Sequence, residues 1–253
     1  MKINKLILFF FCLIVLSPLN LYSQSFGFGC LGFVGGYGGY SIQNFNPTGL
    51  NDYISIYNEI RNDSLTSPMD KFGQAKGYRV GINFFRAKFT GVILTAKGFY
   101  QSLKEKHESL EKFQTGIKNT TLDLALRNWG VGIDLGIPVT KSLSWKIVDG
   151  AVHFNNVSLT STENFPGADT DVKKYTSEST LGYSLGTGFI FSIIEGYISI
   201  EGSAGYTVLS IDRMKLNETT FLTKNENSNE IMENFIEAGG FSALIQLNIG
   251  FPL

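Results

Sequence analysis

The sequence has few charged residues, few prolines and almost no cysteine. Charged residues make up 17% of its 253 residues, whereas soluble domains average about 25%. The low charge, together with 43% hydrophobic residues, 28 Gly and 21 Phe, excludes a disordered tail or a coiled coil and is atypical of a cytosolic enzyme. The net charge is −1 and no basic block occurs, so we expect no nucleic-acid partner.

The first residues have the pattern of a secretory signal peptide. Lys2 and Lys5 precede an apolar run over 6–16, which is too short to cross about 30 Å of hydrocarbon as a helix. We expect cleavage after Ser23, which gives a signal peptide over 1–23 and one domain over 24–253. Cys12 leaves with the signal, so Cys30 remains alone and no intramolecular disulfide can form.

The rest of the chain has no long apolar run, and its apolar residues alternate with small or polar ones. Alternation of this kind is typical of β-strands with one apolar face. It is clearest at the C-terminus, where the apolar positions are Phe241, Ala243, Ile245, Leu247, Ile249, Phe251 and Leu253. Three further segments repeat it, at 77–84, 181–193 and 198–208. Because the second face is mostly Gly, Ser and Asn, the pattern favours a narrow barrel lumen over the charged outer face of a sandwich.

Eight strands are predicted, joined by connections that alternate between short and long. The short ones are 86–88, 140–142 and 195–196, and the long polar ones are 43–72, 103–118, 161–176 and 215–236. An even number of strands with this alternation is typical of a transmembrane barrel with short periplasmic turns and long external loops. The predicted strands are 26–42, 73–86, 89–102, 119–139, 143–160, 177–194, 197–214 and 237–252.

Two of the predicted strands are irregular. In 119–139 the apolar residues occupy even positions up to Leu126 and odd positions from Trp129, which predicts a β-bulge near Arg127 or the end of the membrane-embedded part. In 143–160 the alternation puts Lys146 and Asp149 on opposite faces.

On these patterns the chain resembles the small eight-stranded outer-membrane β-barrel proteins of Gram-negative bacteria, particularly those of Bacteroidota. The resemblance implies an all-β antiparallel transmembrane barrel in the cell outer membrane, surrounded by outer-membrane lipid. It also implies that the barrel assembly machinery recognises the last strand, although Phe251 is followed by Pro252 and Leu253. The residues of this assembly signal are Phe241, Ile245, Leu247, Ile249 and Phe251.

One helix is predicted in the first long loop, over 50–61. Its apolar residues recur at helical spacing, and Thr48 or Asn51 is available as the N-cap. The helix lies over the barrel mouth as a lid or contacts a partner, or it simply packs on the projecting strands. Its apolar residues are Leu50, Tyr53, Ile54, Tyr57 and Ile60.

Four charged residues fall on the strand face opposite the apolar one, and we therefore place them in the lumen. They form either an ion path or a core of internal ion pairs, and the narrow lumen of an eight-stranded barrel favours the core. These residues are Arg79, Lys97, Asp134 and Glu201.

Catalytic chemistry is not expected. Outer-membrane lipid A deacylases carry a His-x-Ser-Asn motif, but the similar stretch from His153 has Asn155 in place of the serine nucleophile. His107 is the only other histidine, so we expect neither a metal site nor a cofactor.

The sequence thus predicts a monomeric, non-catalytic barrel with a structural, adhesive or accessory role through its external loops, and with an unknown envelope or extracellular partner. Two alternatives stay open: a narrow pore or small-molecule transporter, and a soluble secreted barrel that binds an apolar ligand.

Overall fold

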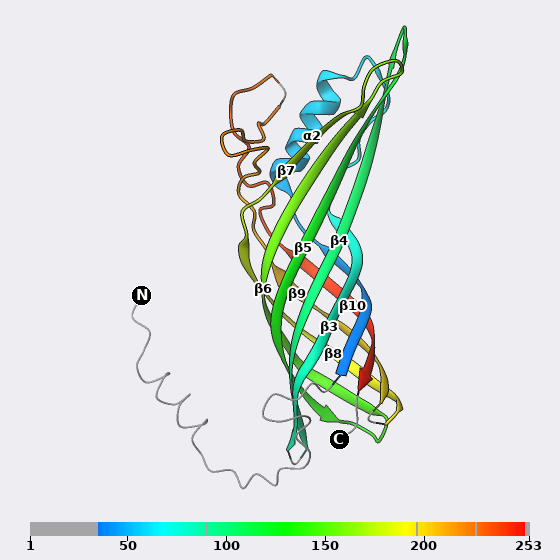
Figure 1. The fold of residues 1–253 in the computed structure, drawn as a ribbon, viewed down its shortest axis with the longest axis vertical. Helices are drawn as coiled ribbons and strands as arrows, with labels where there is room; N and C mark the ends of the chain where they lie inside the picture. The colour runs from blue at the N-terminus through cyan, green and yellow to red at the C-terminus, as the bar shows by residue number, and fades with distance from the viewer. Residues whose placement is uncertain (1–34, 90, 196, 226, 251–253) are drawn as a thin grey trace, which may run out of the picture.

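The computed structural model describes residues 35–89, 91–195, 197–225 and 227–250, and in this part of the chain eight antiparallel strands close a β-barrel (Figure 1). Each strand pairs with two neighbours, and β1 pairs with β10 to complete the ring. The predicted fold class is therefore confirmed. The barrel strands are β1 (Gly35–Asn44), β3 (Gln74–Phe89), β4 (Val92–Phe113), β5 (Gly116–Pro138), β6 (Leu143–Asn164), β8 (Thr180–Ile194), β9 (Ile198–Val208) and β10 (Gly240–Gly250).

Three further elements gather at one end of the barrel, called the helix end below (Figure 1). They are α2 (Thr48–Ile60), β2 (Leu65–Ser67), which pairs with β4, and β7 (Asp171–Thr176), which pairs with β6. The opposite end, where short turns join the strands, is called the turn end. Among the described residues, no helix has the length and apolarity to span a membrane. The predicted signal peptide, the cleavage site and Cys30 lie outside the described residues.

Two of the predicted loops are largely strand. Residues 103–118 extend β4 and β5 into one continuous hairpin whose pairing runs from Ile93–Gly136 to Phe113–Gly116. Residues 161–176 supply the end of β6 and the whole of β7. The loop prediction was wrong because polar residues were taken as loop, whereas a sheet that stands in water can carry polar residues on its outer face.

The predicted turn at 86–88 was also wrong, since β3 continues to Phe89. The reversal falls at Gly91, whose φ of 80° suits glycine. Strand β9 ends at Val208, earlier than predicted. The segment after it, which leads to β10, is held by isolated β-bridges such as Ile211–Ile236.

The apolar residues of β5 change faces without a break in the strand. Pairing with β4 and β6 continues in register through Arg127 and Asn128, so the β-bulge predicted here was wrong. Leu124 and Leu126 point inward and are buried, whereas Trp129 and Val131 point outward and are exposed. The other interpretation holds: the embedded part of the strand ends here. Toward the helix end the interior of the barrel is apolar, and toward the turn end its exterior is apolar.

A bulge does occur in β6, where pairing with β8 shifts between Lys146 and Asp149. The one extra residue turns both side chains into the lumen, and Lys146 Nζ lies 3.1 Å from Asp149 Oδ2. The prediction that they occupy opposite faces was wrong because simple alternation does not survive a bulge.

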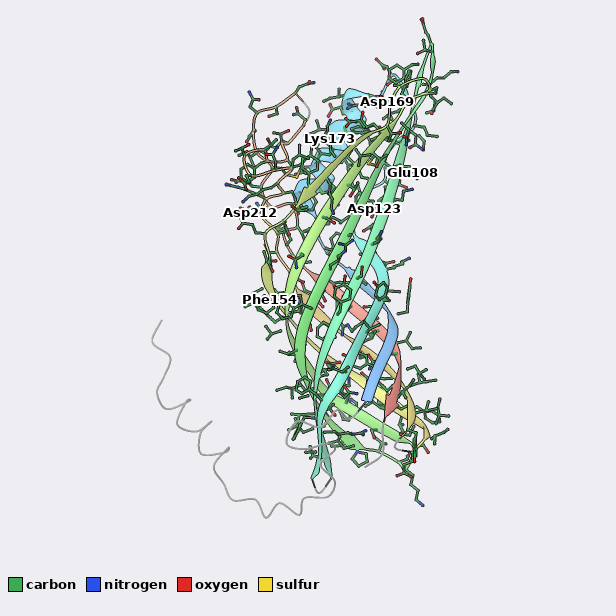
Figure 2. The ribbon with its side chains drawn as sticks, viewed as in Figure 1. Glu108, Asp123, Phe154, Asp169, Lys173 and Asp212 are labelled. Atoms are coloured by element: carbon green, nitrogen blue, oxygen red, sulfur yellow. The ribbon has the colours of Figure 1, made fainter. Side chains whose placement is uncertain are left out.

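The barrel carries an aromatic girdle on its outer surface, defined here as one exposed aromatic residue on each of the eight strands. Register keeps the girdle continuous: Tyr100, Trp129 and Phe154 lie directly opposite one another on β4, β5 and β6, and Trp129 stacks on Phe154 at 4.5 Å between ring centroids. Figure 2 shows Phe154 at this level. The girdle consists of Tyr40, Tyr78, Tyr100, Trp129, Phe154, Tyr183, Tyr206 and Phe241.

Between the girdle and the turn end most outward-facing side chains are aliphatic or aromatic, which makes an apolar belt around the barrel. On β5 the belt begins directly below Trp129 and continues toward Pro138. Its members include Val80, Ile82, Val131, Ile133, Leu135, Val152, Leu185, Phe189, Ile200, Ile245 and Leu247, all of them exposed in the isolated chain.

Candidate functional site

Two lysines and three carboxylates meet inside the barrel, at the level of the apolar belt, and are called the lumen ion cluster. Lys97 Nζ lies 2.8 Å from Asp134 Oδ1 and 2.7 Å from Asp149 Oδ1. Lys146 Nζ lies 3.1 Å from Asp134 Oδ2 and also contacts Asp149 and Glu201. Each lysine is shared between carboxylates, so removal of either lysine leaves buried carboxylates close together without their positive partner.

Amide side chains extend the cluster along the lumen wall. Gln246 Nε2 donates to Glu201 Oε2 at 3.2 Å and to Asn248 Oδ1 at 2.7 Å. Asn248 in turn donates to Ser199 Oγ at 3.3 Å. The bond from Gln246 satisfies Glu201 Oε2, whereas the contact with Lys146 involves Oε1.

Of the four charged residues predicted for the lumen, Lys97, Asp134 and Glu201 belong to the lumen ion cluster. Arg79 also lies inside the barrel, but its Nε donates to Gln101 Oε1 at 2.7 Å and its guanidinium stacks over the Phe99 ring at 4.5 Å. Sequence reasoning missed Lys146 and Asp149, because the bulge that turns them inward leaves no mark in the alternation.

The side chains fill the lumen around the cluster. Lys146 and Lys97 are 1% and 3% exposed. A cavity of about 30 Å³ lies between Arg79, Asp149 and Leu244, which is room for one or two water molecules. In the described part of the chain the arrangement is therefore that of a polar plug.

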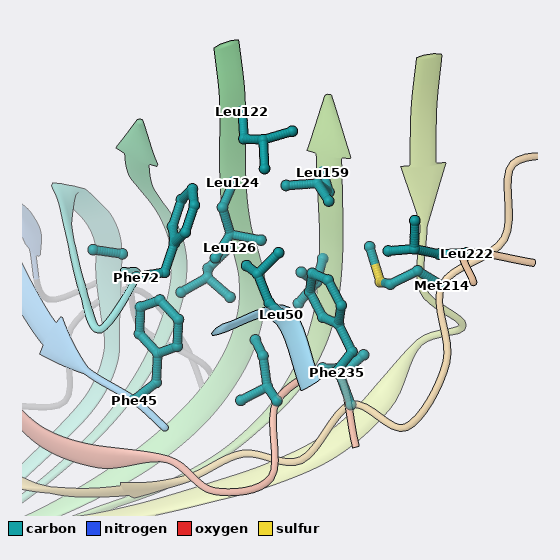
Figure 3. Packing of buried hydrophobic residues seen from close by; sticks show 14 of the residues in the cluster. Phe45, Leu50, Phe72, Leu122, Leu124, Leu126, Leu159, Met214, Leu222 and Phe235 are labelled. Atoms are coloured by element: carbon teal, nitrogen blue, oxygen red, sulfur yellow. The ribbon is translucent and has the colours of Figure 1, made fainter. Parts of the chain in front are cut away.

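The helix end is closed by an apolar cluster, called the mouth core, in which α2 packs against the inner faces of β4, β5 and β6 and against 209–236 (Figure 3). Figure 3 shows Leu50 between Leu126 and Phe235, with Phe45 and Phe72 beside them. Leu50, Ile54 and Phe235 are completely buried.

The structure places the five predicted lid residues differently from one another. Leu50, Ile54 and Tyr57 are buried, Tyr53 packs partly buried against the mouth core, and Ile60 is 56% exposed. The helix therefore presents one buried stripe to the barrel and keeps its opposite side in water.

The predicted N-caps of α2 were wrong. The N-cap is Pro47, with no side-chain cap bond. Thr48 Oγ1 instead donates to Glu237 Oε2 at 2.6 Å, and Asn51 bonds both the N–H and the C=O of Phe72 at 2.9 Å. These side chains tie the helix to neighbouring segments rather than to its own backbone.

A buried polar contact joins the far end of α2 to β4. The Tyr57 hydroxyl donates to Glu111 Oε1 at 2.8 Å and lies 3.0 Å from Ser109 Oγ. Arg61 Nε lies 3.4 Å from Glu111 Oε2, and its guanidinium covers the Tyr57 ring at 4.1 Å. Burial raises the pKa of Tyr57 to about 12.

This contact predicts a pH dependence for the packing of α2. Tyr57 keeps its proton longer in the folded state than in the unfolded chain, where its pKa is about 10. Its stabilisation is therefore complete below about pH 10 and is lost as the pH rises toward 12. We expect the protection of the α2 amides, measured relative to the base-catalysed exchange rate of an unfolded chain at the same pH, to fall over this range in the wild type. The Tyr57→Phe variant should exchange faster at neutral pH and show a smaller pH effect, and equal pH profiles for both proteins would contradict this.

The two histidines of the chain lie in different surroundings. His153 is buried, and its Nδ1 lies 2.9 Å from Asn155 Oδ1. His107 Nε2 lies 3.0 Å from Glu105 Oε1, and its ring packs edge-on against Phe72. Within the described residues, no group of three or more His, Cys, Asp or Glu is placed to hold a metal ion.

The last strand faces lipid with the residues predicted to be its assembly signal. Phe241, Ile245, Leu247 and Ile249 all point outward and are exposed in the isolated chain, while Leu244 and Gln246 point into the barrel. Phe251 lies outside the described residues. Recognition by the assembly machinery stays a prediction.

A closed antiparallel barrel with an outward apolar belt, an aromatic girdle and a polar lumen is the architecture of an outer-membrane β-barrel. Closure leaves no unpaired strand edge in the hydrocarbon, and the belt replaces the charged surface of a water-soluble barrel. The protein is thus a small outer-membrane barrel, located in the outer membrane. Because the short turns of such barrels face the periplasm and the long connections face outward, we expect the helix end to lie outside the cell.

Neither a protein-family model nor a curated protein sequence matches the chain. Solved structures with a similar fold include the attachment invasion locus protein Ail of Yersinia pestis, at 10% identity and a TM-score of 0.40, covering 87% of this chain and 99% of that one. Outer membrane protease OmpT from Escherichia coli is similar at 9% identity and a TM-score of 0.38, covering 87% and 94%. Neisserial surface protein A has 9% identity and a TM-score of 0.29, covering 85% and 97%.

Proposed function

We propose that this protein is a non-conducting, non-catalytic outer-membrane barrel that acts through the part of its structure outside the cell, in an adhesive or accessory role. The observation that carries the proposal is that the barrel is blocked twice. The lumen ion cluster fills the membrane level, and the mouth core seals the external end. A pore needs a continuous column of water, and an eight-stranded barrel filled in this way has no room for one.

The external hairpin of β4 and β5 supports the adhesive part of the proposal. Its tip exposes Phe113 and Ile117 far above the girdle, and Phe165 packs edge-on against Phe113 at 5.8 Å. Figure 2 shows Asp169 near this tip, and Lys112 lies directly opposite Ile117 in the hairpin, so the apolar residues have charged neighbours. Apolar residues rimmed by polar ones are a common feature of protein contact sites.

The lumen ion cluster and the mouth core together predict that the barrel does not conduct ions. The purified barrel in a planar lipid bilayer should give no steady conductance, because both blocks must open before ions can pass. A control variant that truncates the apolar side chains of the external tip, Phe113→Ala with Ile117→Ala, should also show no conductance. A stable open channel in the wild type would contradict the proposal and favour the narrow pore.

The adhesive role has a separate test. Beads coated with the wild-type barrel in lipid nanodiscs should adhere to host extracellular matrix or to neighbouring bacterial cells, and the Phe113→Ala, Ile117→Ala variant should adhere less. Equal adhesion by both proteins would remove the tip from the contact. No adhesion by either protein would leave the barrel without an adhesive function.

A further inference from the structure

We propose that Lys76, Lys104 and Arg127, on the outer wall of the barrel, bind the phosphate groups of a lipid headgroup in the outer leaflet of the membrane. This proposal is independent of whether the barrel conducts or adheres, because it concerns the lipid-facing surface and neither the lumen nor the tip.

Strand register places the three cations directly above the aromatic girdle. Lys76 and Arg127 each stand two residues from the girdle residue of their own strand, toward the helix end, and Lys104 stands four residues beyond Tyr100. All three point outward. Girdle aromatics sit at the level of the lipid headgroups, and lysine and arginine can extend toward the phosphates from there.

The three charges are poorly compensated by the protein. Lys76 lies directly opposite Lys104 on the neighbouring strand, a pairing of like charges that is unfavourable unless an anion lies between them. Arg127 lies opposite Ser102, which makes it the diagonal neighbour of Lys104. Asp123 approaches Lys104 only to 3.7 Å, with 59% of the lysine side chain exposed. Among the described residues, neither Lys76 nor Arg127 forms an ion pair.

The cations are confined to three adjacent strands. On β4 the cation stands four positions above the girdle residue, with Ser102 between them. On the other five strands, the residues two and four positions above the girdle residue include no cation; those at two positions are Ile42, Asn156, Leu181, Val208 and Gly239. If these charges served only solubility, we would expect them at this level on all the strands and not only on β3, β4 and β5. A patch of two ammonium groups and one planar guanidinium matches a phosphate-bearing headgroup, because arginine binds phosphate oxygens in a bidentate manner.

The test uses the refolded mature chain in zwitterionic detergent micelles, titrated with lipid A, with thermal unfolding followed by gel mobility. Lipid A should raise the unfolding temperature of the wild type. In the K76Q/K104Q/R127Q variant, the concentration of lipid A needed for half of the shift should rise by at least about tenfold. The control variant K112Q/K173Q/K224Q loses the same three charges from exposed positions farther out and should respond like the wild type.

Three outcomes would overturn the proposal. The site variant could respond like the wild type, or both variants could weaken equally, which would indicate general charge attraction. Inorganic phosphate at the same phosphate concentration could reproduce the full shift, which would indicate a free anion in place of a lipid. If the triple variant does not refold, Arg127→Gln against Lys112→Gln repeats the comparison, and equal responses of these two would again overturn it.

Discussion

Replacing Lys146 by methionine is expected to lower the free energy of unfolding by about 3–5 kcal/mol, the usual cost of leaving buried charges unpaired. Lys146 is 1% exposed and contacts Asp134, Asp149 and Glu201. Without it, Asp134 and Asp149 would share Lys97, and Glu201 would lose its lysine partner. Urea titration of the barrel refolded in detergent, followed by gel mobility without boiling, measures the change.

Two companion variants make this result specific. Lys173→Met removes an exposed lysine whose ion pair with Asp171 lies in water, so it should change the free energy of unfolding by less than about 1 kcal/mol. Adding Glu201→Gln to Lys146→Met removes one of the unpaired carboxylates and should recover part of the loss. An unchanged midpoint for Lys146→Met would mean that water reaches the cluster, and that result would favour the pore.

The second large effect is expected at the external end, where Ile54→Asp should release α2 from the barrel. Ile54 is completely buried in the mouth core. Truncating such a residue to alanine already costs about 2–5 kcal/mol, and an unpaired carboxylate costs more. We expect protease added to intact cells to cut within 48–72 in this variant, while the membrane part keeps its heat-resistant gel mobility.

Ile60→Asp is the matched control, because it makes the same substitution on the same helix at an exposed position. It should leave 48–72 protected. If Ile54→Asp also abolishes the heat-resistant mobility, the mouth core and the membrane part unfold as one unit. If neither variant is cut, the mouth core is not what holds α2.

The parts of the fold that could be predicted from the sequence are those where the surroundings are uniform. Below the girdle every strand has lipid on one side and a polar lumen on the other, so alternation alone places Ile245, Leu247 and Ile249 outward. Above it the solvent outside is water, and the outward residues of β4 and β5 become polar. A strand with polar residues on its outward face then resembles a loop in the sequence, although Lys104 and Lys106 lie in a regular hairpin.

The candidate site shows a second limit of the same reasoning. The alternation of the strands predicts Lys97, Asp134 and Glu201 in the lumen, and the structure places them there. The positions of Lys146 and Asp149 could not be predicted without knowing of the bulge in β6. The face change at Leu126 and Trp129 was visible in the sequence. Its cause, a change from membrane to water around an unbroken strand, required the pairing of β5 with both neighbours.

Because β4 and β5 continue without a break beyond the girdle, the tip of their hairpin lies far from the membrane surface. About eleven residues separate Arg127 from the reversal at Gly116. At about 3.4 Å per residue and a tilt of about 40°, they lift the tip roughly 30 Å above the cation patch. One headgroup layer is only about 6 Å deep. A partner can therefore meet Phe113 and Ile117 at a distance from the lipid surface. The arm that carries them is a hairpin paired with β6 and β2 along most of its length, and its base packs in the mouth core.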